Sequence, residues 1–245
     1  MVSKLFIESK PVALGFEHLY LVLETAEGIE KVIRGGTERD IPIFFGQLEV
    51  VEVDKLLSES EDKRVDGNGN ILTPAQRNQT LINLDGRDAQ DVWNIAVQHA
   101  RNINDRFNYN AFVLATNSNS TIASVLRAVG IDILDNLPGG KSPFTFPGID
   151  NFLLNFSNTL VGKTSDDVIV GGYGDDRLEG GVGEDLLTGS RGNDTLIGGI
   201  GADTALYESS YIENNRFNYE IDRDTNGIDF RSEEHTSELQ SPVPI

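Results

Sequence analysis

The chain has 245 residues, a formal net charge of −19 and no cysteine. So strong a negative charge argues against binding to DNA, RNA or anionic lipid, and the lack of cysteine excludes disulfides, thiolate zinc sites and a cysteine nucleophile. The length allows one large domain or two modest ones. No apolar run approaches the roughly 18 residues of a membrane-spanning helix, and the N-terminus lacks the apolar core and cleavage site of a signal peptide.

The first elements of the chain are predicted as strands. Residues 18–24 alternate, with three leucines on one face, and residues 27–36 follow as their hairpin partner. Residues 42–54 give a further strand. The polar run 58–70 is interpreted as a solvated loop. Within it, residues 66–70 begin like an EF-hand calcium loop, but the required glycine and final glutamate are missing, so we expect a simple turn.

Two helices are predicted next. The first begins near Asp88, and its apolar stripe repeats every three or four residues and includes His99, which we interpret as a packed side chain. The second spans about 119–129, capped by small polar residues and stopped by glycine. A loop rich in proline and glycine follows. Residues 1–155 are therefore expected to form an α+β domain, an antiparallel sheet with packed helices.

A nine-residue repeat occupies residues 162–206. Its units follow the pattern G-G-x-G-x-D-x-U-x, where U is a large aliphatic residue in the first four units and Ala205 in the fifth. The first unit lacks two of its glycines, and Ser190 replaces one in the fourth. The sixth position of every unit is an aspartate: Asp167, Asp176, Asp185, Asp194 and Asp203.

These in-phase units resemble the RTX calcium-binding repeat of hemolysin-type secreted proteins. The resemblance implies an all-β parallel β-roll over residues 156–206, in which six residues of each unit form a loop and three form a short strand. Units two apart then stack, which places Asp167 beside Asp185 and Asp185 beside Asp203. Carboxylates and loop carbonyls supply the oxygen ligands that Ca²⁺ prefers, so we expect the five aspartates to bind calcium. One aliphatic residue per unit buries little, which predicts that the region is disordered until calcium binds.

The C-terminal residues are divided into two parts. Residues 207–230 read as strands and turns and are expected to be a truncated β cap on the roll. Residues 231–245 begin Arg-Ser-Glu-Glu-His-Thr-Ser-Glu-Leu-Gln-Ser, which resembles the in-frame translation of a common sequencing adapter. We interpret that segment as an artefact. The absence of cysteine and of a signal peptide, together with the repeats, points to a secreted bacterial protein exported without a signal peptide.

Two residues of the N-terminal region form a candidate catalytic pair. His18 begins a predicted strand, and Ser118 lies at the start of the second predicted helix, in Thr-Asn-Ser-Asn-Ser-Thr. This order resembles the permuted papain-like domains of the lecithin retinol acyltransferase and PPPDE types, with serine in place of the cysteine nucleophile. The resemblance implies that His18 is the base and that backbone N–H groups at the helix start form an oxyanion hole. The third, orienting residue stays open, with Glu24, Glu30 and Arg34 as candidates.

Several functions remain open on this evidence. The pair could serve a hydrolase or acyltransferase that acts on an amide or ester of a protein, peptide or lipid. Equally, the polar residues around Ser118 could merely cap the helix and His18 could be an ordinary strand residue. The protein would then be a calcium-dependent adhesion or binding module, or a structural protein of a surface array.

Overall fold

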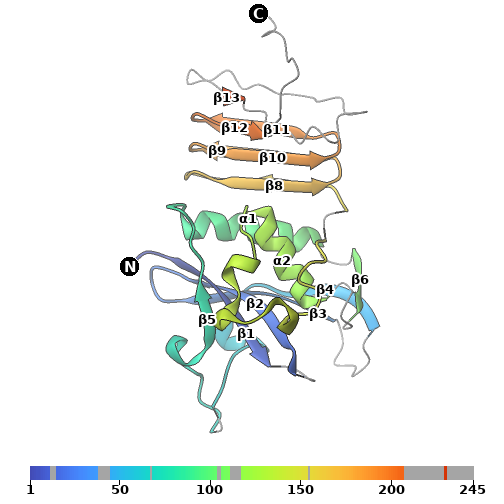
Figure 1. Cartoon of the computed structure of the whole chain (residues 1–245). Helices are drawn as coiled ribbons and strands as arrows, with labels where there is room; N and C mark the ends of the chain where they lie inside the picture. Colours follow the sequence, from blue (N-terminus) through green and yellow to red (C-terminus); the bar gives the residue numbers. More distant parts are fainter. Residues whose placement is uncertain are drawn as a thin grey trace, which may run out of the picture.

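The structure is a computed structural model of the whole chain. It describes residues 1–11, 15–37, 45–66, 68–103, 106–110, 117–153, 155–206 and 229–230. Antiparallel strands and two helices make up the N-terminal part, and short parallel strands make up the repeat region (Figure 1). The predicted cap over 207–228 and the segment 231–245 lie outside the described residues.

Six antiparallel strands form the N-terminal sheet, in the order β5-β1-β2-β3-β4-β6. The hairpin predicted from 18–36 is present: β2 pairs with β3 in antiparallel register, with Leu21 opposite Ile33. β1 and β5 were not predicted from the sequence, and they extend the sheet beyond β2. The strands are β1 (Lys4–Pro11), β2 (Glu17–Glu24), β3 (Glu30–Thr37), β4 (Phe45–Leu56), β5 (Asn78–Leu81) and β6 (Phe107–Asn110).

Both predicted helices are present and cover one face of this sheet. Helix α1 spans Ala89–Ile103 and α2 spans Ser118–Ala128. The leucines at 19, 21 and 23 of β2 are fully buried and belong to the same apolar cluster as the inner faces of both helices. His99 is fully buried on α1, as its place in the apolar stripe predicts. No helix among the described residues is long and apolar enough to cross a membrane.

The opposite face of the sheet carries a smaller apolar cluster. Tyr20 and Val22 of β2 pack there with Val32 and Leu57. Leu57 begins a single turn of 3-10 helix, Leu57–Glu59, which folds the predicted solvated loop back against the sheet. The interpretation of residues 58–70 as solvated was therefore wrong at Ser60 and Asp62, which are buried.

The repeat region consists of two parallel stacks of short strands. One stack contains β7 (Thr159–Val161), β9 (Arg177–Val182) and β11 (Thr195–Ile200). The other contains β8 (Val168–Tyr173), β10 (Leu186–Arg191), β12 (Thr204–Leu206) and β13 (Asp229–Phe230). Strands 18 residues apart pair in register, as Leu187 does with Ile169, and this arrangement is consistent with a β-roll.

The helices lie between the antiparallel sheet and the repeat strands (Figure 1). Helix α1 contacts β7, and α2 contacts β8. The buried aliphatic residues inside the stacks join the same apolar cluster as the helices: Leu160, Ile169, Leu178 and Leu187. One hydrophobic core therefore runs from the N-terminal sheet through the helices into the repeats.

Candidate functional site

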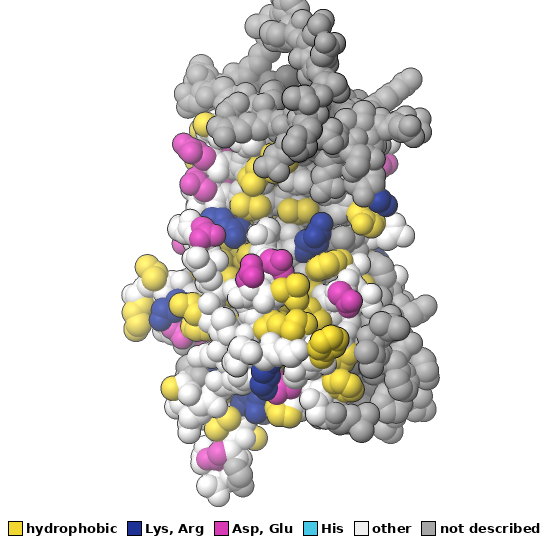
Figure 2. All heavy atoms as spheres, in the orientation of Figure 1, with side chains coloured by type: hydrophobic (Ala, Val, Ile, Leu, Met, Phe, Trp, Pro, Cys, Tyr) yellow, Lys and Arg dark blue, Asp and Glu magenta, His cyan; other side chains and the backbone are white. Residues whose placement is uncertain are grey.

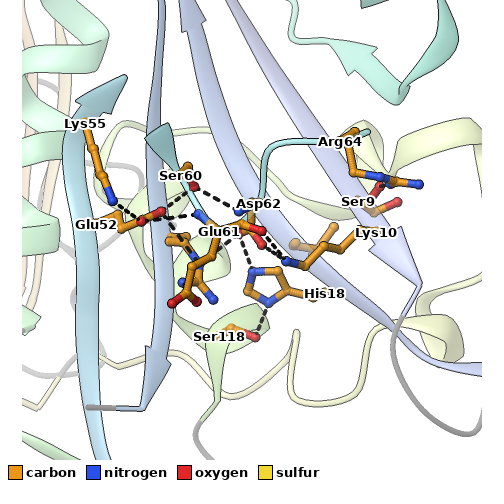
Figure 3. Close-up of polar contacts among 12 residues, drawn as sticks. Ser9, Lys10, His18, Glu52, Lys55, Ser60, Glu61, Asp62, Arg64 and Ser118 are labelled. Atoms are coloured by element: carbon orange, nitrogen blue, oxygen red, sulfur yellow. Dashed lines mark hydrogen bonds and ion pairs between the residues drawn. The ribbon is translucent and has the colours of Figure 1, made fainter. Parts of the chain in front are cut away.

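The structure brings His18 and Ser118 together and adds an acidic residue. Ser118 Oγ lies 2.7 Å from His18 Nδ1, and His18 Nε2 lies 2.8 Å from Asp62 Oδ2 (Figure 3). All three side chains are buried or nearly so. A hydroxyl, an imidazole and a carboxylate linked in this order form the serine–histidine–aspartate arrangement of nucleophilic hydrolases. Here Nδ1 faces the serine and Nε2 the aspartate, the reverse of the ring orientation in chymotrypsin-type enzymes.

Asp62 is held in its charged form by its surroundings. Burial alone would raise the pKa of Asp62, but the His18 ring, Arg34 and Lys10 together hold that pKa well below its ordinary range. Arg34 Nε lies 2.9 Å from Asp62 Oδ2, and the Lys10 ammonium forms an ion pair with Oδ1. The Asp62 N–H donates to Ser60 Oγ at 3.0 Å, which fixes the backbone as well. A charged carboxylate here is placed to orient the imidazole and to stabilise an imidazolium.

The start of α2 positions the nucleophile. Asn117 is the N-cap, and its side chain accepts hydrogen bonds from the N–H groups of Asn119 and Ser120. The Ser120 hydroxyl completes the reciprocal bond of a capping box by accepting from the Asn117 N–H at 3.2 Å. The capping interpretation of this segment therefore holds for Asn117 and Ser120. Ser118, the first residue of the helix, takes no part in the cap and faces His18 instead.

Asn119 ties the strand that carries His18 to the helix that carries Ser118. Its Oδ1 accepts from the Leu19 N–H at 2.8 Å, and its Nδ2 donates to the Glu17 carbonyl at 3.0 Å. These are the backbone groups on either side of His18. The paired register of β2 with β3 ends at Leu21, so the side-chain amide of Asn119 substitutes there for a neighbouring strand.

Gly35 lets α2 approach the sheet at the nucleophile. A Cβ atom added to Gly35 would lie 3.0 Å from Ser118 Cα and 2.6 Å from Thr121 Oγ1. Such contacts are closer than real Cβ atoms tolerate from a backbone atom or from a buried hydroxyl. A side chain at this position would therefore push the first turn of α2 away from β3.

Gly35→Ala is expected to separate Ser118 from His18 while leaving the sheet paired. The overlap should cost roughly 1–3 kcal/mol of stability, and a displacement of about 1 Å should slow reaction of the serine about 100-fold. Rates of covalent labelling by a fluorophosphonate probe, with melting temperatures measured in parallel, test both effects. Labelling at the wild-type rate would show that the close approach of Gly35 is not needed.

The three sequence candidates for the orienting residue are not the partners of His18. The Glu30 carboxylate forms an ion pair with Arg77, and Glu24 lies 3.6 Å from Lys4 Nζ. Arg34 does reach the site, but through Asp62 rather than through the imidazole. Asp62 could not be predicted as the partner of His18, because it lies in a run of charged residues typical of a surface loop. The local signal for its burial is the apolar Leu57, which anchors the turn before it.

The repeat aspartates form two buried ladders. In each, the backbone N–H of one aspartate donates to Oδ1 of the aspartate 18 residues later: Asp167 to Asp185 at 2.8 Å, Asp176 to Asp194 at 2.9 Å, and Asp185 to Asp203 at 3.0 Å. The predicted stacking of units two apart is thus present. All five sixth-position side chains are buried. The acidic side chains visible on the surface of the stacked strands in Figure 2 are other residues.

The remaining oxygens of these carboxylates fit a calcium ion. Buried oxygens without a hydrogen-bond partner occur at Asp167, Asp176, Asp185 and Asp203. A Cβ atom on Gly162 would collide with Asp167 Oδ2 and with the Gly180 carbonyl oxygen. A Cβ atom on Gly180 would likewise collide with Asp185 Oδ2 and with the Gly198 carbonyl oxygen. Glycine thus clears a space where carboxylate and carbonyl oxygens converge, which is the donor set of Ca²⁺. Among the described residues, no three acidic or histidine side chains cluster as a metal site on their own.

Without a cation, burial favours the protonated form of Asp167, Asp176 and Asp185. Burial raises the pKa of Asp167 to about 6 and the pKa values of Asp176 and Asp185 to about 7. These pKa values lie above the ordinary value of 3.8. Between pH 3.8 and about 7, the folded repeats therefore bind more protons than the unfolded chain. The free energy of unfolding of the calcium-free repeats must therefore fall as the pH rises through this range.

We expect acid to promote folding of the repeats when calcium is absent. In EDTA, the circular dichroism signal of β structure should grow as the pH is lowered from about 8 to about 5, because protonation removes the cost of burying charged carboxylates. With saturating calcium, the signal should already be complete at the higher pH. A calcium-free signal that stays constant or weakens on acidification would contradict the burial of these side chains.

Comparison with known families supports the repeats. Residues 154–187 and 170–205 match the RTX calcium-binding nonapeptide repeat (4 copies). RTX calcium-binding repeats imply that this region binds Ca²⁺. No match to curated proteins or to solved structures was found, so the resemblance of the N-terminal region to permuted papain-like domains has no support from these comparisons.

Proposed function

We propose that the protein is a secreted, calcium-binding hydrolase or acyltransferase that acts on an amide or ester through an acyl-enzyme. The observation that carries the proposal is the hydrogen-bonded series from Ser118 through His18 to Asp62. Capping alone would not require Ser118 to face an imidazole that is itself oriented by a buried, charged carboxylate. The proposal rests on this geometry and not on likeness to a known enzyme.

The proposed reaction uses each member in turn. Ser118 Oγ attacks the carbonyl carbon of the substrate while its proton passes to His18 Nδ1, and the carbonyl π bond opens to a tetrahedral oxyanion. The imidazolium is stabilised by Asp62, which accepts from the Nε2–H. When the oxyanion collapses, the bond to the amine or alcohol breaks and that leaving group takes the proton from His18. Water, or a second acceptor in a transferase, then attacks the acyl-enzyme with His18 again as the base.

The helix start supplies the charge that the oxyanion needs. N–H groups in the first turn of a helix have no acceptor within that helix, and the helix dipole adds partial positive charge there. Asn117 takes the N–H groups of Asn119 and Ser120. The Ser118 N–H, next to the nucleophile, is the donor that we assign to the oxyanion.

A direct test is covalent labelling of the wild-type protein. A fluorophosphonate probe reacts with an activated serine and not with an ordinary helix-capping hydroxyl. We expect one adduct per chain, located by peptide mass spectrometry at Ser118. No adduct under conditions that label a known serine hydrolase, or an adduct at another serine, would contradict the proposed function and favour a non-catalytic binding or adhesion module.

The chain is further proposed to have two functional parts. Residues 1–155 would carry the chemistry, and residues 156–206 would form the calcium-dependent β-roll. The five sixth-position aspartates would be the calcium ligands. Secretion is proposed because proteins with RTX repeats are typically secreted.

A further inference from the structure

The roll begins one unit before the nine-residue units of 162–206, in a segment that the family match also enters at residue 154. Residues 153–161 contain no glycine and no aspartate, but Asn158 stands 18 residues before Asp176 and Leu160 stands 18 before Leu178. The Asn158 N–H donates to Asp176 Oδ1 at 2.6 Å. The same bond joins Asp167, Asp176 and Asp185 to the aspartate 18 residues later. Leu160 is fully buried opposite Leu178 in the register of β7 with β9. Residues 153–161 are therefore a degenerate unit of the roll.

In this unit the side chain at the sixth position is neutral and already satisfied. Asn158 Nδ2 donates to the Gly171 carbonyl at 2.8 Å. Asn158 Oδ1 lies 3.1 Å from His99 Nδ1 and 3.2 Å from Asn102 Nδ2, both on α1. A carboxylate could not donate to that carbonyl and would add charge beside Asp176. The amide N–H of Asn158 thus donates to a loop carbonyl at the position where each later unit has a carboxylate.

Helix α1 supplies the rest of the support for this first level. The Val161 N–H donates to Gln98 Oε1, and Gln98 Nε2 donates to the Val161 carbonyl, each at 2.9 Å, so that the side chain pairs with β7 as a strand would. Burial lowers the pKa of His99 to about 4, so its ring is neutral and can donate from Nδ1 to Asn158. The His99 ring also stacks on Phe156, with centroids 5.6 Å apart.

We propose that Asn158, Gln98 and His99 build a calcium-independent first level of the roll on α1, from which the calcium-dependent levels extend. Repeat arrays need a terminal unit that closes the exposed end of the core, and here the helix face and an asparagine do so without a metal. This inference concerns assembly of the roll and does not depend on the proposed enzymatic activity.

Hydrogen exchange of the full chain in EDTA tests the proposal. In EDTA the amides of β7 are expected to exchange at least about tenfold more slowly than those of β9, β10 and β11, and calcium should slow exchange far more in the latter group than in β7. If β7 exchanges as fast as β9 to β11 in EDTA while α1 remains protected, the first level is not independent of calcium and the proposal is wrong.

The variant Asn158→Asp restores the repeat pattern and should make the first level depend on calcium. In EDTA, β7 should exchange at least about tenfold faster than in the wild type, and calcium should restore its protection. Asn193→Asp adds the same charge at an exposed fifth position and should leave β7 unchanged. Protection of β7 in EDTA that survives Asn158→Asp would overturn the proposal.

A second variant tests the proposal even if Asn158→Asp also destabilises α1. Gln98→Ala removes both hydrogen bonds to Val161 without adding charge. Its expected effect is faster exchange of β7 in EDTA with α1 still protected and with protection restored by calcium. Wild-type exchange of β7 in this variant would show that α1 does not hold the first level.

Discussion

Asp62→Asn is expected to slow labelling of Ser118 by a fluorophosphonate, and turnover of any ester substrate, about 10³- to 10⁴-fold. Asparagine has nearly the same shape, so the fold should persist. It can, however, present an amide N–H to His18 Nε2, which would favour the tautomer that carries its proton on Nδ1. That tautomer cannot accept the proton of Ser118, whose Oγ lies 2.7 Å from Nδ1. The rate of labelling should therefore fall, and the melting temperature should fall as well, because Arg34 and Lys10 lose the buried carboxylate with which they pair.

A matched variant separates this effect from a general change of charge. Glu61→Gln removes the neighbouring carboxylate, which is exposed and lies 2.6 Å from Arg34 Nη1. It should change the labelling rate less than about threefold, because surface ion pairs contribute little. Ser118→Ala should abolish the adduct altogether. Equal rates for Asp62→Asn and Glu61→Gln would show that Asp62 does not orient His18.

Asp185→Asn is expected to weaken calcium-driven folding of the repeats by at least about tenfold in calcium concentration, because one buried negative ligand is lost. Asp185 sits in the middle of its ladder. It accepts from the Asp167 N–H and donates its own N–H to Asp203 Oδ1. Asparagine keeps the acceptor at Oδ1, so the effect should come from the charge that faces the ion.

Calcium titrations followed by circular dichroism measure this effect. Glu184→Gln removes the same charge from the exposed residue next to Asp185 and should move the midpoint far less. Removal of calcium from the wild type by EDTA at neutral pH should abolish the β signal of units 162–206. If the two variants shared one midpoint, the sixth-position aspartates would not be the calcium ligands.

Local patterns predicted much of this structure. The hairpin of β2 and β3, both helices and the phase of the repeats each depend on spacing within a short stretch of sequence. β1 was missed because Glu8, which is fully buried, interrupts its alternation of apolar residues. Residues 156–161 were expected within the roll, but 153–161 could not be recognised as a repeat unit, because the segment has neither glycines nor an aspartate and keeps only Asn158 and Leu160 in phase.

The candidate site was predictable only in part. The order of a strand histidine and a helix-start serine can be read along the chain, and it led to His18 and Ser118. Asp62 cannot be read this way, because its burial results from the turn at Leu57 that packs on the far face of the sheet. Its charge is kept by Arg34 and Lys10, which come from two other strands. Such a convergence exists only in the folded protein.

Helix α2 contacts both functional regions of the molecule. Its first residue is Ser118, while just beyond its last turn Gly130 lies so close to Val168 of β8 that a side chain at 130 would collide with it. Residues of α2 and of the repeat strands belong to one continuous hydrophobic core. Free energy gained by calcium in the repeats, about 2.7 kcal/mol at one hundred times the dissociation constant, therefore also opposes unfolding of the helix that holds the nucleophile. In calcium-poor surroundings the nucleophile helix would be less stable, and in calcium-rich surroundings both regions would melt together as one cooperative unit.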